Sequence, residues 1–166
     1  MTPLRLLFSA IIPALSELAS GGIPDTPAAR RFLLAIALQE SGLRNRRQVG
    51  ADGAESGPAA SFWQFEKGGG CKGVLTHHSS LDHMKWVCDA YNVESTPEGL
   101  WQAMRYNDIV AACAARLMIF TLPGKLPITA EEGWNQYVSA WRPGTPKPDT
   151  WAANWDTASR VVGESA

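Results

Sequence analysis

Apolar side chains recur at helical spacing along most of the chain. Residues 4–19 are almost wholly apolar and predict a helix, with Pro13 as the expected kink because proline lacks the backbone N–H that a helix interior needs. A second apolar stripe predicts a helix over 27–41, which Asp25 or Thr26 would cap and the following glycine would close. The first forty or so residues therefore predict two apolar helices joined by a turn.

Apolar periodicity predicts five further helices, over about 80–91, 97–105, 107–120, 130–141 and from 149 or 150 to 162. Asn107 or Asp108 is placed to cap the third of these, and Thr129 and Glu132 have the spacing of a capping box before the fourth. We find no alternating strand pattern of useful length and no internal repeat. The sequence predicts a mostly α fold that forms a single domain over residues 1–166.

A long polar stretch, residues 44–60, separates the second helix from the rest of the chain. Loops of that length inside a compact domain are usually functional or mobile. The sequence therefore predicts a functional or mobile loop here.

The composition is typical of a folded globular protein, with 45% of the residues hydrophobic and 19% charged. A chain of 166 residues can bury about 70% of its unfolded surface, which fits one domain. The formal net charge of −1 argues against a dedicated nucleic-acid binder, which usually carries a strong basic excess. The seven tryptophans fit either a sugar-binding surface or a core.

The segment MTPLRLLFSAIIPALSELAS resembles a signal peptide in its arginine, its apolar run and its small residues. Pro13 within the run and Glu17 just after it argue against that interpretation. We expect a first helix packed on the core, with secretion as the less favoured alternative. No apolar run in the sequence has the length of a membrane span, and we expect no membrane anchor.

Three cysteines make an odd count, which favours a reducing compartment. We expect Cys113, in the small-residue stretch AACAARL, to be a buried thiol, whereas Cys71 and Cys88 could pair. The segment CKGVLTHHSSLDHMKWVC also holds three histidines, a mixture that zinc sites use, but its spacings match no standard zinc motif. We therefore expect no metal and no other cofactor.

The helix predicted over 27–41 carries a carboxylate, Glu40, on its apolar face, because Ile36 and Ala37 precede it at helical spacing. A buried carboxylate is costly unless it is paired or keeps its proton. Glu40 is therefore either a core acid satisfied by an arginine or a backbone group, or a carboxyl with a raised pKa that can donate a proton.

Three short segments, AIALQES (35–41), FWQ (62–64) and AWRPG (140–144), resemble in order and spacing the motifs of the lysozyme-like lytic transglycosylase fold, which goose-type lysozymes share. In that family a glutamate–serine pair ends an AxxxQES helix, a GLMQ-like segment follows a loop, and an AYNAG-like segment closes the site. The resemblance covers about residues 27–144. It implies a lysozyme-like domain that cleaves the MurNAc–GlcNAc β-1,4 bond of peptidoglycan, by hydrolysis or by forming an anhydro product.

The resemblance also implies roles for individual residues. Glu40 would be the general acid and then the base, and Ser41 would hold Glu40, contact substrate or cap its helix. Gln64 would bond a sugar hydroxyl, an N-acetyl group or the backbone of the opposite wall, the alternative being a loop glutamine that faces water. The other candidate substrate-binding residues are Phe62 and Trp63, as a stacking surface or as core lids, together with Glu66, Tyr137, Trp141 and Arg142.

The third motif departs from the family. Trp141 stands where the family has tyrosine, and Arg142 where it has asparagine. Either Tyr137 or Trp141 could aim a polar hydrogen at Glu40, as the family's tyrosine does. The lost tyrosine and asparagine also support a competing interpretation, a non-enzymatic virion or cell-wall-binding protein that keeps the fold.

Glycosidases usually need a second carboxylate, and Asp52, Glu55 and Glu66 are the candidates. A lytic transglycosylase needs only one, because the substrate's own 6-hydroxyl closes on the anomeric carbon. The basic run RNRRQ (44–48) could contact carboxylates of peptidoglycan, although a solvated loop is the favoured interpretation.

The sequence lacks a clear signal peptide and contains the WRPG segment, and in both respects it resembles phage-encoded cell-wall lysozymes carried in virions. That resemblance implies synthesis in the cytoplasm of a bacterial host and association with the virion. It implies the peptidoglycan glycan strand as the binding partner, with other virion proteins as further candidates.

Overall fold

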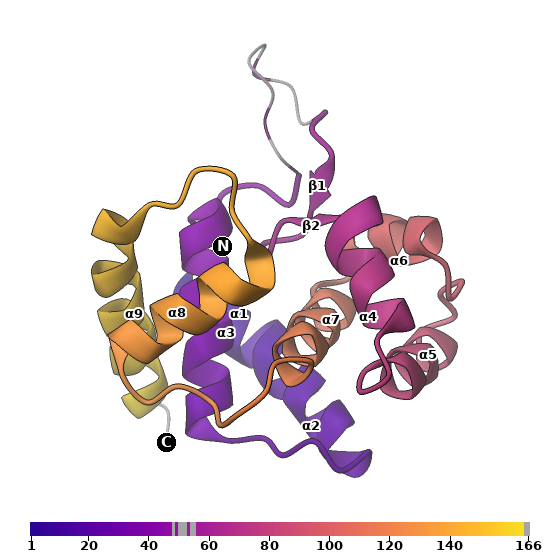
Figure 1. The fold of residues 1–166 in the computed structure, drawn as a ribbon, viewed down its shortest axis with the longest axis horizontal. Coiled ribbons are helices and arrows are strands. Elements are labelled where there is room, and N and C mark those ends of the chain that lie inside the picture. The colour runs from indigo at the N-terminus through magenta and orange to yellow at the C-terminus, as the bar shows by residue number, and fades with distance from the viewer. Residues whose placement is uncertain (48, 50–52, 54–55, 165–166) are drawn as a thin grey trace.

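A computed structural model describes residues 1–47, 49, 53 and 56–164, and within them the fold is mostly α, as the sequence predicts (Figure 1). The helices are α1 (Pro3–Leu6), α2 (Ile12–Ser20), α3 (Pro27–Ser41), α4 (Lys72–Thr76), α5 (Leu81–Ala90), α6 (Pro97–Met104), α7 (Asp108–Phe120), α8 (Ala130–Trp141) and α9 (Pro148–Gly163). Two π-helical turns cover Leu7–Ile11 and Lys67–Cys71, and the strands are β1 (Ala59–Ala60) and β2 (Phe65–Glu66).

The first helical segment runs continuously through Pro13. A π-helical turn, in which the Ile12 N–H donates to the Leu7 carbonyl, lies directly before the proline and accommodates it. By length and composition the continuous helix Pro3–Ser20 could cross a membrane, so the expectation that no run reaches that length is wrong. Its inner face is buried against α3 and α7, as expected for a first helix packed on the core.

The centre of the fold is formed by α3 and α7. Residues 32–37 of α3 and 110–117 of α7 are all buried. Helices α8 and α9 lie on one side of this centre, with α9 packed along α3, while α4, α5 and α6 surround α7 on the other side (Figure 1). The carboxyl end of α3 therefore lies between the two groups of helices.

Local capping signals set several helix ends where the sequence predicts them. The Thr26 hydroxyl caps α3, and Gly42, at a φ of 56°, ends it in the left-handed conformation that favours glycine. Asn107 caps α7, and Thr129 and Glu132 form the expected capping box of α8. The last helix starts slightly earlier than predicted, at Pro148.

A two-stranded antiparallel hairpin precedes α4, and the sequence pattern did not predict it. Ala59 pairs with Glu66, and Ala60 pairs with Phe65. Ser61 and Gln64, in the turn between them, have φ values of 67° and 52°. Each strand is only two residues long, so neither carries the alternation that marks a strand in a sequence.

Candidate active site

A groove of about 510 Å³ runs between the end of α3, the hairpin and the end of α8. This volume falls in the range usual for small-molecule and cofactor sites. Six of the nine site residues predicted from sequence line it: Glu40, Gln64, Glu66, Tyr137, Trp141 and Arg142. Glu40, Gln64 and Trp141, each named as a site residue by a different one of the three motifs, therefore line the same groove.

Glu40 lies in the last turn of α3, half-buried in the wall of the groove. Its Oε1 accepts a hydrogen bond of 2.6 Å from the Tyr137 hydroxyl. Burial raises the pKa of the Glu40 carboxyl above its usual value, and this effect exceeds the opposing effect of the Tyr137 hydrogen bond. The negative end of the α3 dipole further disfavours the carboxylate. Glu40 therefore holds its proton to a higher pH than an exposed glutamate.

The other carboxyl oxygen of Glu40, Oε2, has no hydrogen-bond partner among the residues that the structure describes, whereas Oε1 is held by Tyr137. A neutral carboxyl anchored through one oxygen can present the proton on the other to a ligand in the groove. This arrangement is what a general acid requires.

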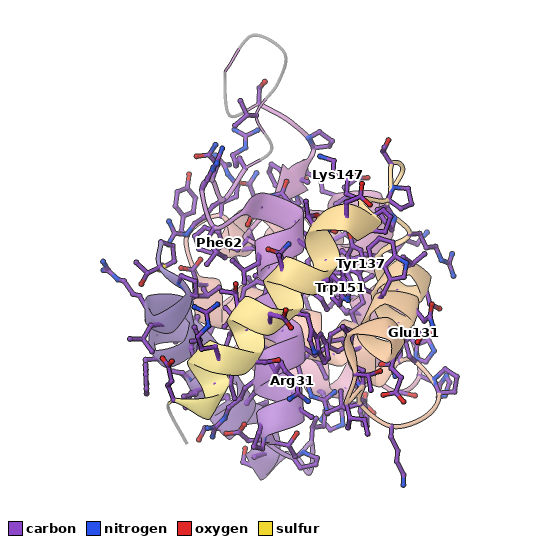
Figure 2. The ribbon with its side chains drawn as sticks, turned by 90° about the vertical axis from the view of Figure 1, so that its left-hand side faces the viewer. Arg31, Phe62, Glu131, Tyr137, Lys147 and Trp151 are labelled. Atoms are coloured by element: carbon purple, nitrogen blue, oxygen red, sulfur yellow. The ribbon has the colours of Figure 1, made fainter. Side chains whose placement is uncertain are left out.

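Tyr137 is fixed in place by aromatic rings. It is buried on α8, and its ring stacks on Trp151 of α9, with centroids 5.2 Å apart and planes 12° from parallel (Figure 2). Trp141 stacks on it less closely, at 6.3 Å. Burial and the neighbouring Glu40 raise the pKa of the Tyr137 hydroxyl, so the phenol stays protonated and remains the donor.

Trp141 has a different partner. Its indole N–H donates to the Trp63 carbonyl at 2.8 Å, and its ring meets Phe65 edge to face at 5.9 Å. The indole N–H is therefore not aimed at Glu40, and of the two candidates the polar hydrogen comes from Tyr137. Trp141 ties α8 to the hairpin and so holds the two walls of the groove together.

Two of the predicted residues, Gln64 and Arg142, occupy left-handed backbone positions, with φ values of 52° and 48°. The Gln64 amide NH₂ donates to the Ser61 carbonyl at 2.7 Å, and its side-chain carbonyl oxygen has no hydrogen-bond partner among the described residues. Arg142 ends α8 and is exposed at the groove. Glu66, at the end of β2, is exposed in the same groove.

Phe62 and Trp63 do not form a stacking surface, so that alternative is wrong. Both are buried in the core, with exposed fractions of 1% and 0%. The Trp63 indole N–H donates to the Leu33 carbonyl of α3 at 2.9 Å, and Phe62 packs under the Arg46 guanidinium. They lie in a turn whose two left-handed residues are Ser61 and Gln64, and they close the core beneath the hairpin.

Ser41 caps its own helix. Its hydroxyl donates to the Ala37 carbonyl at 2.9 Å and accepts from the Leu43 N–H at 3.2 Å. It does not line the groove. Of the three alternatives for Ser41, the structure supports the cap.

Asp52 and Glu55, two of the candidates for a second carboxylate, lie outside the described residues. Among the described residues that line the groove, the carboxylates are Glu40 and Glu66. Glu66 is therefore the remaining candidate that can be placed.

Gln39 is a groove residue that was not predicted from the sequence. Gln39 donates to the Lys147 carbonyl at 3.0 Å, and its Oε1 accepts from Asn154 at 2.8 Å and from Thr150 at 3.1 Å. These bonds hold the start of α9, and with it the segment 142–147 that forms part of the wall, against the end of α3. The only signal in the sequence was that Gln39 directly precedes Glu40 in AIALQES.

The cysteines and histidines form no joint site among the described residues. All three cysteines are buried free thiols, so Cys71 and Cys88 do not pair, and Cys113 is buried as expected. His77 and His78 stack on each other with centroids 4.4 Å apart. Across the described residues, no group of three or more His, Cys, Asp or Glu side chains could hold a metal ion.

Comparison of the chain with protein-family models, with curated proteins and with solved structures gives no match. The chemistry that we assign to the groove therefore rests on the residues that line it.

Proposed function

We propose that the protein is a lysozyme-like glycosidase that cleaves the MurNAc–GlcNAc bond of peptidoglycan, with Glu40 as general acid and then base. The observation that carries the proposal is a carboxyl group in a groove, with its pKa raised by burial and one oxygen held by Tyr137. A carboxylic acid whose pKa is raised in this way keeps its proton to a higher pH and can give it to the leaving oxygen of a glycosidic bond.

The convergence of the sequence motifs supports the same proposal. Segments 35–41, 62–64 and 140–144 are far apart in the chain, yet each contributes at least one residue to the groove wall. The end of α3, the hairpin and the end of α8 bring them together. Their convergence in one groove supports the proposal that they act together on one substrate.

The proposed reaction uses the two oxygens of Glu40 differently. Tyr137 holds Oε1, and protonated Oε2 gives its proton to the glycosidic oxygen as the bond to the anomeric carbon breaks. The resulting carboxylate then takes a proton from the attacking hydroxyl. That hydroxyl belongs either to water, which gives a hydrolysed sugar, or to C6 of the same sugar, which gives an anhydro ring.

Product analysis tests the proposal and separates the two routes. Purified peptidoglycan is incubated with the protein, and the released fragments are separated and weighed by mass spectrometry. We expect glycan fragments with either a reducing end or an anhydro end, the latter lighter by one water. Release of no fragments by a protein that still sediments with the cell wall would overturn the enzymatic proposal and favour the wall-binding alternative.

A further inference from the structure

A second hollow, of about 430 Å³, adjoins the groove at Glu66, which lines both. Its other charged lining residues are Arg47 and Lys67, and Trp101 of α6 forms part of its wall. Figure 1 shows the hairpin between the end of α8 and α6, so the groove and this hollow lie on its two sides. We call it the Trp101 hollow.

Three cations surround the Trp101 indole ring. The Lys67 ammonium lies 4.4 Å from the ring centroid, the Arg105 guanidinium 5.3 Å and the Arg47 guanidinium 5.6 Å. Stacking on a ring stabilises these cations but supplies no countercharge. Of the three, only Lys67 forms an ion pair among the described residues, with Glu98 at 2.6 Å.

Arg47 is the least satisfied of these cations. Its Nε is buried and has no hydrogen-bond partner among the described residues, and its terminal nitrogen reaches the Gly57 carbonyl only at 3.5 Å. A buried guanidinium nitrogen without an acceptor is costly, and an anionic ligand with two oxygens would satisfy it best. Among the described residues, the charges lining the hollow are therefore Arg47, Lys67 and Glu66, and the Arg47 Nε is a donor without an acceptor.

We propose that the Trp101 hollow binds a carboxylate of the peptide stem, while the sugars of the same strand occupy the groove. The inference rests on the proposed function. Peptidoglycan carries on alternate sugars a lactyl ether extended by a short peptide with free carboxyl groups. Because the hollow opens beside the groove at Glu66, a strand in the groove can place such a group there. The protein would then select peptide-bearing strands over neutral glycans.

Equilibrium binding tests this inference without cleavage. Soluble glycan fragments are prepared with free stem carboxyls, and a second batch has the same carboxyls amidated. Binding is measured by calorimetry on the Glu40→Gln variant, which keeps the groove but cannot transfer the proton. We expect amidation to weaken binding about fivefold, as loss of a partly exposed ion pair does, and added salt to weaken only the binding of the free-carboxyl fragments.

Arg47→Gln and Lys67→Gln, each in the Glu40→Gln background, should weaken binding of the free-carboxyl fragments by a similar factor and leave the amidated ones unaffected. Arg44→Gln and Lys72→Gln are matched controls, because both side chains are exposed and line neither the groove nor the hollow. Because Lys67 is exposed, Lys67→Gln should leave the fold intact, and it therefore tests the inference even if Arg47→Gln misfolds.

Equal affinity for the two kinds of fragment, or equal losses for both in the variants, would overturn the inference. This failure is distinct from failure of the proposed function. If the wild-type protein cleaves peptidoglycan but the Glu40→Gln variant binds amidated and free-carboxyl fragments equally well, only the inference about the Trp101 hollow is contradicted. If the wild-type protein cleaves no peptidoglycan but its binding of fragments depends on Arg47 and on free carboxyl groups, only the proposed glycosidase activity is contradicted.

Discussion

The Tyr137 hydroxyl lies 2.6 Å from Oε1 of Glu40, although 97 residues separate the two along the chain. The contact joins the end of α3 to α8, and the stacked rings of Trp151 and Trp141 hold the phenol in place. It orients the carboxyl and lowers its pKa, while burial raises that pKa. The two effects act on the pKa in opposite directions, which makes them separable by mutation.

The pH dependence of activity and of stability should both report the raised pKa of Glu40. Cleavage should fall as the pH rises through that pKa, because the acid form is lost. Folding favours the protonated carboxyl, so its stabilising contribution is complete below the usual pKa of 4.5 and is lost as the pH rises through the raised value. Urea unfolding of wild type and Glu40→Gln across this window should show the variant gaining relative stability. A cleavage rate that does not fall as the pH becomes alkaline would contradict the role of Glu40 as general acid.

Tyr137→Phe should move the alkaline limb of the cleavage profile to higher pH. The hydrogen bond from Tyr137 lowers the pKa of Glu40, so removing it lets burial raise the pKa further. The maximal rate should fall on the order of tenfold, because the carboxyl loses its anchor. Tyr106→Phe is the control, since Tyr106 is 79% exposed and lies outside the groove. An unshifted limb in Tyr137→Phe would show that the hydrogen bond does not act on the acid.

Two glycine-to-alanine substitutions should change the stability of the fold in opposite directions. A Cβ on Gly133 of α8 would lie 2.5 Å from the Trp155 ring, so Gly133→Ala should destabilise the fold by about 1–3 kcal/mol. A Cβ on Gly73 of α4 would enter open space, with nothing within 4 Å, so Gly73→Ala should stabilise the fold by about 0.5–1 kcal/mol. Denaturant unfolding measures both. A neutral Gly133→Ala would mean that α8 and α9 pack less closely than the structure has them.

The three thiols should be unreactive in the folded protein. Burial raises the pKa values of Cys71 and Cys113 to about 12, and it raises that of Cys88 as well. Alkylation near pH 8 followed by mass spectrometry should label none of them quickly in the native state and all three after unfolding. Cys113 found in a disulfide in unreduced protein would overturn both its burial and the expected reducing compartment.

Apart from α4 (Lys72–Thr76), which the sequence pattern did not predict, the helices were predictable because their signals are local. The Thr129–Glu132 capping box and the Thr26 cap use residues within three positions of each other, and the structure places both as predicted. Glu40 was also recognisable, because a carboxylate on an apolar helix face is conspicuous in the sequence. These features need no knowledge of distant parts of the chain.

The hairpin and the distribution of its side chains were not predictable in the same way. Phe62 and Trp63 are aromatic residues in a turn, and whether they face a groove or the core depends on the left-handed backbone at Ser61 and Gln64. Tyr137 and Trp141 share one face of α8, and the choice between them depends on where the Trp63 carbonyl lies. Only the tertiary arrangement decides such cases.

The most direct measurement is peptidoglycan cleavage by Glu40→Gln, with the melting temperature determined on the same sample. Glutamine keeps the shape and can still accept the Tyr137 hydrogen bond, but it has no proton to transfer. We expect a folded variant, at least as stable as wild type at neutral pH, with cleavage reduced at least about a hundredfold. Wild-type cleavage by a folded Glu40→Gln protein would contradict the assignment of Glu40 as the catalytic acid.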